Sequence, residues 1–64
     1  MADLYRRLAR LLRDGGCELR RQGKGSHEIW YSPLTKRTFS VPRNLTSQRL
    51  GNEILKQAGL PKAF

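Results

Sequence analysis

"CELRRQGKGSHEIWYSPLTKRTFSV", residues 17–41, is the stretch of sequence that decides the fold class. Its apolar residues recur at about every second position, whereas the flanking segments repeat at a helical period of about 3.6 residues. The turn-forming clusters GKGS and SPLTK divide it into three strand-length pieces, which we place at residues 17–22, 27–31 and 36–41. Because both connections are short, consecutive strands are expected to pair antiparallel, with Pro33 setting the second turn.

Alternation along each predicted strand indicates which side chains share a face. Cys17 and Leu19 share one face of the first strand, and Phe39 and Val41 share one face of the third. The middle strand is ambiguous, because each of its faces carries one charged or titratable residue and at least one aromatic residue. The two sets are His27, Ile29 and Tyr31 on one face, and Glu28 and Trp30 on the other.

Amphipathic helices are predicted on both sides of the strands. Residues 3–14 place four leucines and a tyrosine on one side of a helix and four arginines on the other. Residues 47–58 carry a second apolar stripe, and Gly59 marks its end. Two helices that must each bury an apolar stripe pack most economically on one face of a three-stranded sheet. We therefore predict an α+β fold, an α-β-β-β-α two-layer sandwich, as a single domain over residues 1–64 with the other sheet face in water.

Charge and size limit what such a protein can bind. The chain has 13 Lys and Arg against 5 Asp and Glu, a net charge of +8, so a polyanion is its natural partner. Nucleic acid is favoured over a membrane because no long apolar run is present. A chain of this length has no room for a deep substrate cavity. Its sole cysteine, Cys17, and an N-terminus without the apolar region of a signal peptide favour a cytoplasmic location.

The titratable residues favour metal-independent chemistry on RNA. One histidine, one cysteine and five scattered carboxylates show no spacing typical of metal ligands, so neither a metal nor another cofactor is expected. RNA cleavage requires less apparatus than peptide hydrolysis, because the 2′-hydroxyl beside the scissile phosphate is already placed as a nucleophile. Histidine is the residue type most often used as a general acid or base near neutral pH, so His27 is the candidate for that role.

The positive and aromatic residues around His27 are candidates for RNA contacts. Lysine and arginine side chains supply charge to the phosphate, and Trp30 or Tyr31 can stack on an unpaired base. Ordinary structural explanations stand beside these: GKG is typical of a hairpin turn, and one aromatic of the pair belongs to the core. The residues predicted to bind RNA are Lys24, Ser26, Arg20, Arg21, Arg43 and Trp30.

The run "GCELRRQGKGSHEIWYSP", followed by "RTFSVPRN" and "ILKQAGL", resembles the HicA family of small mRNA-interferase toxins. The resemblance implies a double-stranded-RNA-binding-domain-like fold and the toxin of a type II toxin-antitoxin system. It also implies a metal-independent endoribonuclease that cleaves messenger RNA and arrests growth, with His27 as the catalytic residue. A HicB-type antitoxin encoded by an adjacent gene is the implied partner.

One departure from the family pattern affects the expected chemistry. Many members carry a second histidine shortly after the "VP" element, whereas this chain has Asn44 after Arg43. The second proton-transfer group would then be Lys24, Tyr31 or a water molecule. Two alternatives follow from the same residues: a non-catalytic RNA-binding module that docks on RNA by shape, and a degenerate toxin of weak activity.

Overall fold

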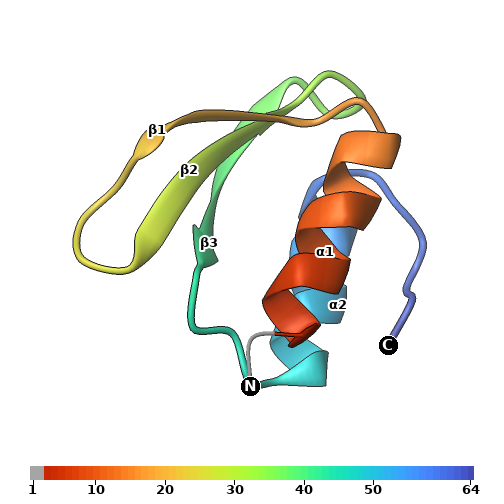
Figure 1. Cartoon of the computed structure of the whole chain (residues 1–64). Coiled ribbons are helices and arrows are strands. Elements are labelled where there is room, and N and C mark those ends of the chain that lie inside the picture. The colour runs from red at the N-terminus through yellow and green to blue at the C-terminus, as the bar shows by residue number, and fades with distance from the viewer. Residues whose placement is uncertain (1–2) are drawn as a thin grey trace.

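Two helices flank three consecutive strands in the computed structural model, which describes residues 3–64 (Figure 1). The elements are α1 (Asp3–Asp14), β1 (Glu18–Gln22), β2 (His27–Ser32), β3 (Arg37–Pro42) and α2 (Gln48–Gln57). The predicted α-β-β-β-α order is confirmed, and every element begins and ends within one residue of its predicted limits. The strands form one antiparallel sheet in the order β1-β2-β3.

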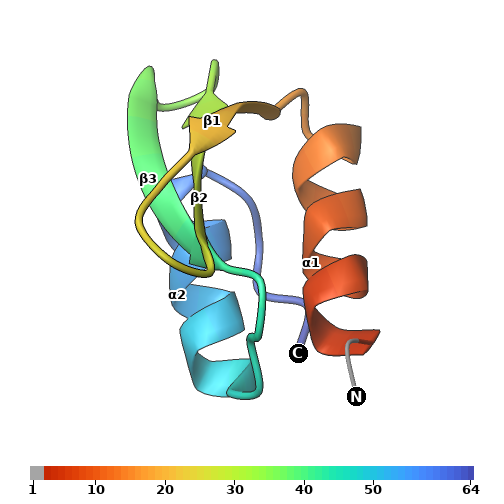
Figure 2. The same ribbon diagram turned by 60° about the vertical axis from the view of Figure 1, so that its left-hand side comes forward.

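Both helices cover the same face of the sheet: in Figure 1 they lie on one side of the strands, and the turned view of Figure 2 separates them, with α2 below β3 and α1 across from β1. The inward face of β2 contacts each of them: the Tyr5 hydroxyl of α1 donates to the Glu28 carboxylate, with 2.6 Å between the oxygens. At the other end of β2, the Ser32 hydroxyl donates at 2.6 Å to the carbonyl of Ala58, just after α2. The α+β two-layer arrangement with an uncovered sheet face is therefore confirmed.

The structure resolves which face of β2 points inward. Glu28, Trp30 and Ser32 are buried, whereas His27 is exposed and the residues that share its face are only partly covered. Trp30 is the largest fully buried side chain and packs with apolar residues of both helices and of β3. The inward residues of β2 therefore include the carboxylate of Glu28, and the burial of this carboxylate depends on partners from other elements.

β1 is an edge strand and is the least covered part of the sheet. Its register against β2 shifts between Leu19 and Arg21, which leaves Arg20 as the extra residue of a bulge. Cys17 is buried just before the strand, but Leu19 stays 44% exposed although it pairs with the buried Trp30. The predicted shared face therefore holds for β3, where Phe39 and Val41 are both buried, and is incomplete in β1.

Glycines end both helices in the same way. The amides of Gly16 and Cys17 donate to the carbonyls of Arg13 and Leu12 at the end of α1, each at 2.9 Å, and Gly16 has a φ of +88°. Gly59, with a φ of +82°, ends α2 through an equivalent pair of bonds. This Schellman arrangement satisfies the last carbonyls and sets the direction in which the chain leaves. Within residues 3–64, neither helix has the length and hydropathy needed to span a bilayer.

Gly16→Ala tests the left-handed end of α1. A Cβ at this position would meet only Pro33 Cγ at 3.5 Å, an ordinary contact, so the cost comes from the positive φ alone. We expect Gly16→Ala to lower the free energy of unfolding by about 1–2 kcal/mol and Gly16→Asn to lower it less, because asparagine tolerates this conformation. Urea denaturation measures both, and equal stability of the two variants would contradict the assignment.

Candidate functional site

His27 is the first residue of β2, and hydrogen bonds fix its backbone at the β1–β2 hairpin. The Gly23 amide donates to the His27 carbonyl at 2.8 Å, and the His27 amide donates to the Lys24 carbonyl at 3.1 Å. On the other side, the Arg43 amide donates to the Ser26 carbonyl at 2.8 Å. The imidazole is thus carried on a constrained backbone while it remains exposed on the sheet face that no helix covers.

Two of the predicted RNA-binding arginines lie on this helix-free face with His27. Arg21 pairs across the sheet with Ile29, whose side chain has the same parity as His27. The Arg20 guanidinium lies 4.5 Å from the centroid of the Tyr31 ring, and its Nε is 3.1 Å from the exposed Glu18 carboxylate. The face therefore combines an exposed imidazole with two guanidinium groups and one aromatic ring.

Trp30 does not belong to this surface, and the prediction that it binds RNA is wrong. Its side chain is 0% exposed, and its indole Nε1 donates to the Glu28 carboxylate at 3.1 Å. Arg13 of α1 covers the ring, with 5.4 Å between the guanidinium carbon and the ring centroid. A base has no access to either side of this indole. Tyr31, on the opposite face of β2, is the partly exposed aromatic residue of the pair.

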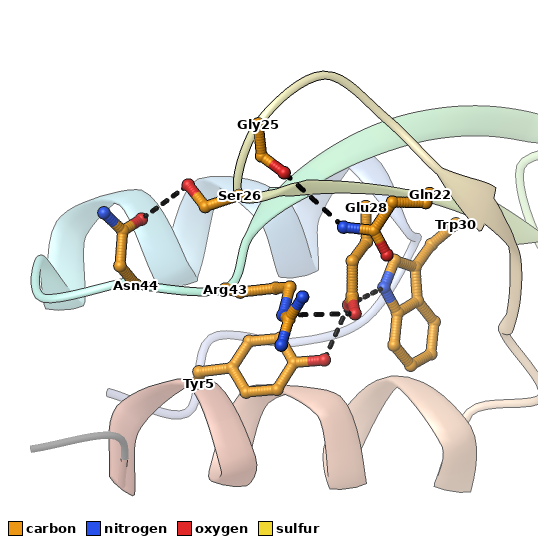
Figure 3. Close-up of polar contacts among 8 residues, drawn as sticks. All are labelled: Tyr5, Gln22, Gly25, Ser26, Glu28, Trp30, Arg43 and Asn44. Carbon is orange, nitrogen blue, oxygen red and sulfur yellow. Dashed lines mark hydrogen bonds and ion pairs between the residues drawn. The ribbon is translucent and has the colours of Figure 1, made fainter.

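Glu28 is a buried carboxylate of β2 that contacts α1 and the segment after β3 (Figure 3). One of its oxygens accepts hydrogen bonds from the Tyr5 hydroxyl and the Trp30 indole, and the other lies 3.9 Å from Arg43 Nε. A buried charge is tolerated only when it is paired and hydrogen-bonded, and Glu28 meets both conditions. Sequence reasoning missed this residue. Its only signal was the parity that it shares with Trp30.

A shallow groove of about 410 Å³ opens between the start of α1 and the segment that follows β3. It is lined by Tyr5, Arg6, Ser26, Arg43 and Asn44. The Ser26 hydroxyl and the Asn44 side-chain oxygen are 3.4 Å apart at its rim (Figure 3). Two predicted RNA-binding residues, Ser26 and Arg43, meet here, and sequence reasoning did not single out Arg6, because four arginines share the outer side of α1.

The predicted site residues are thus divided between two places. Successive residues of a strand point to opposite faces, so His27 faces the helix-free side because Glu28 is buried on the helix side. Ser26, in the turn just before β2, lines the groove. Lys24 is exposed in the hairpin turn beside them. The start of β2 is therefore the boundary between the two surfaces.

Position along β2 argues against Tyr31 as the second proton-transfer group. Tyr31 lies four positions after His27 on the same strand, which at roughly 3.3 Å per residue places their Cα atoms about 13 Å apart. A phenol at that distance would not reach a phosphodiester linkage bound at the imidazole. Lys24, whose carbonyl accepts from the His27 amide, and water are the remaining candidates.

The Tyr5 hydroxyl has a raised pKa. Burial of the phenol raises its pKa above the ordinary value of 10.0, and the hydrogen bond to Glu28 and the negative charge of that carboxylate raise it further. The positive charges of Arg13 and Arg43 act in the opposite direction. Tyr5 therefore stays a neutral donor to Glu28 through the physiological range.

The fold and these surfaces define a small basic α+β protein with an open three-stranded sheet and one exposed histidine on its uncovered face. The family model described as the HicA toxin of bacterial toxin-antitoxin matches residues 5–60, most of the chain. The chain belongs to the HicA toxin family and is the toxin of a toxin-antitoxin system, whose partner is an antitoxin. Comparison with curated proteins and with solved structures gave no match.

Tyr5→Phe tests the coupling between α1 and Glu28. Removing a hydrogen bond to a charged group is expected to lower the free energy of unfolding by about 1.5–3 kcal/mol at neutral pH. Because the folded pKa of Tyr5 is raised, this contribution is complete below pH 10 and declines as the pH rises through the folded value. Chemical denaturation of both proteins from neutral to alkaline pH measures the difference. A difference that stays constant above pH 10 would contradict the raised pKa.

Proposed function

We propose that this toxin is a metal-independent endoribonuclease that cleaves messenger RNA, with His27 as its general acid or base. The observation that carries the proposal is the exposed imidazole of His27, which is held at the start of the central strand on an open, positively charged sheet face. HicA family toxins are known as RNA-cleaving toxins, which supports the same assignment. A flat, accessible face suits an RNA strand better than a small metabolite.

The proposed reaction uses the nucleophile that RNA itself carries. The 2′-hydroxyl oxygen attacks the adjacent phosphorus and loses its proton, and the bond from phosphorus to the leaving 5′-oxygen breaks as that oxygen gains a proton. The His27 imidazole performs one of these two transfers, a role typically worth about 10²–10⁴ in rate. Lys24 or a water molecule performs the other. Lys24 and Arg21 stabilise the negative charge that develops on the phosphorane.

The antitoxin that we propose is of the HicB type, encoded by a gene beside that of the toxin. A toxin surface with a net charge of +8 favours acidic groups on the partner, since complementary potentials accelerate association and fix its orientation. The helix-free face is the surface that such a partner must cover to keep His27 from RNA. Because the substrate is messenger RNA, we place the toxin in the cytoplasm.

His27→Ala tests the catalytic assignment directly. Purified wild-type protein and the variant are incubated with synthetic messenger RNA in EDTA, and the rate of chain cleavage is measured. We expect the wild type to cleave without metal ions and His27→Ala to be about 10²–10⁴-fold slower. Ser40→Ala is the matched control, because Ser40 is exposed on the neighbouring strand and pairs with Ile29, two residues from His27.

The outcomes separate the three interpretations of the site. If His27→Ala binds RNA and arrests growth as the wild type does, the protein is a non-catalytic RNA-binding module. If the wild type neither cleaves nor arrests growth when it is produced without its antitoxin, it is a degenerate toxin. If the wild type loses cleavage in EDTA, the reaction is not metal-independent. The role of His27 is then tested by comparing the wild type with His27→Ala in the presence of Mg²⁺.

A further inference from the structure

We infer that the groove between α1 and the segment after β3 binds a phosphate of single-stranded RNA, and that it forms a subsite distinct from the surface around His27. The inference rests on the proposed function, because it takes RNA as the ligand. It adds Arg6 and Asn44 to the residues that contact this ligand.

The chemistry of the groove suits a phosphodiester. Arg6 and Arg43 contribute two guanidinium groups, whose planar N–H donors match pairs of phosphate oxygens. Asn44 adds a neutral donor: its side-chain oxygen accepts from the Ser26 hydroxyl, which leaves the side-chain NH₂ for an anion. Among residues 3–64, Arg6 has no acidic partner within ion-pair distance. Its charge is therefore available to a ligand.

Arg43 is held in the groove by groups beneath and beside it. Its amide donates to the Ser26 carbonyl, and its Nε lies 3.9 Å from the carboxylate of Glu28 (Figure 3). The Glu28 side chain is only 8% exposed, whereas that of Arg43 is 57% exposed, so an entering phosphate meets the guanidinium before the carboxylate. The Tyr5 hydroxyl is committed to Glu28 and contributes a wall rather than a donor.

The groove lies across the start of β2 from the imidazole. His27 is the first residue of β2 and has the parity opposite to that of the buried Glu28, whereas Ser26, the turn residue just before it, lines the groove. An RNA strand that passes around this end of the sheet therefore places one phosphate at His27 and another phosphate in the groove. Contacts in the groove act on a linkage that is not cleaved, so they affect binding of RNA and its KM more than kcat.

Arg6→Gln and Arg37→Gln form a matched pair for the test. Each variant removes one exposed arginine, but Arg37 is at the opposite end of β3 from Arg43 and pairs with Ser32. The probe is a short fluorescent single-stranded oligonucleotide with 2′-O-methyl sugars, which lacks the nucleophile and is not cleaved. Fluorescence anisotropy is measured over a series of salt concentrations.

Arg6→Gln is expected to weaken binding about tenfold at low salt, as for a lost hydrogen bond to a charged group. It is also expected to reduce the salt slope by about 0.7, the value for one phosphate contact of a single strand.

A second pair of variants tests the groove by adding negative charge. Asn44→Asp has nearly the same shape as the native side chain and still accepts from Ser26, and Gln57→Glu adds the same charge at the exposed end of α2. We expect Asn44→Asp to weaken oligonucleotide binding several-fold more than Gln57→Glu. Circular dichroism and thermal unfolding establish that all four variants fold.

The results distinguish this inference from the proposed ribonuclease activity. If the two variants of each pair lose the same oligonucleotide affinity, net charge alone explains the loss and the groove is not a phosphate subsite. This conclusion holds even if the wild type cleaves RNA. A selective loss for Arg6→Gln and Asn44→Asp supports the groove, and it does so even if wild-type protein fails to cleave messenger RNA. Selective weakening of antitoxin binding with unchanged oligonucleotide binding would also overturn it.

Discussion

The buried carboxylate of Glu28 is the interaction on which the arrangement of this protein depends. Its hydrogen bond from Tyr5 ties the first turns of α1 to the middle strand, and its bond from Trp30 satisfies the only polar atom of the largest core side chain. Its second oxygen faces Arg43 in the segment after β3. A small domain has little apolar surface to bury, so an uncompensated charge at this point would cost a large share of its stability. The hydrogen bonds and the guanidinium offset that cost.

The same residue links the core to the surface that we assign to RNA. The Arg43 guanidinium lies next to the Glu28 carboxylate, which the Tyr5 hydroxyl of α1 holds in place. The position of the guanidinium therefore depends on the packing of α1 against β2 as well as on its own loop. On the other side of β2, His27 is supported by backbone bonds of the hairpin and by its pairing with β3, and the bond from the Arg43 amide to the Ser26 carbonyl is shared with the groove. The side chain of His27, unlike the Arg43 guanidinium, does not depend on the contact between α1 and Glu28. A substitution that loosens α1 disturbs the groove before it disturbs the imidazole.

The sequence predicted the elements closely because local signals agree along the chain. Gly16 and Gly59 end the helices with the left-handed conformation that glycine favours, and short turns leave antiparallel pairing as the simple solution. The inward face of β2 was not predictable, because local alternation assigns a charged residue to either face. What decides it is Tyr5, which is 23 residues away from Glu28 and lies within the apolar stripe of α1. Trp30 was assigned to RNA binding for the same reason, since only the tertiary partners show that it is covered.

The groove also changes how Asn44 is understood. From the resemblance alone, an asparagine at this position removes a second imidazole and therefore a proton-transfer partner for His27. In the structure, Asn44 contacts Ser26 and lines the groove on the helix side of the sheet, while the imidazole of His27 lies on the opposite face. A side chain at position 44 is thus better placed to contact a bound strand than to exchange protons at the linkage next to His27. With Asn44 neutral, Arg6 and Arg43 supply the positive charge of the groove, and in the reaction that we propose the second proton transfer is assigned to Lys24 or water.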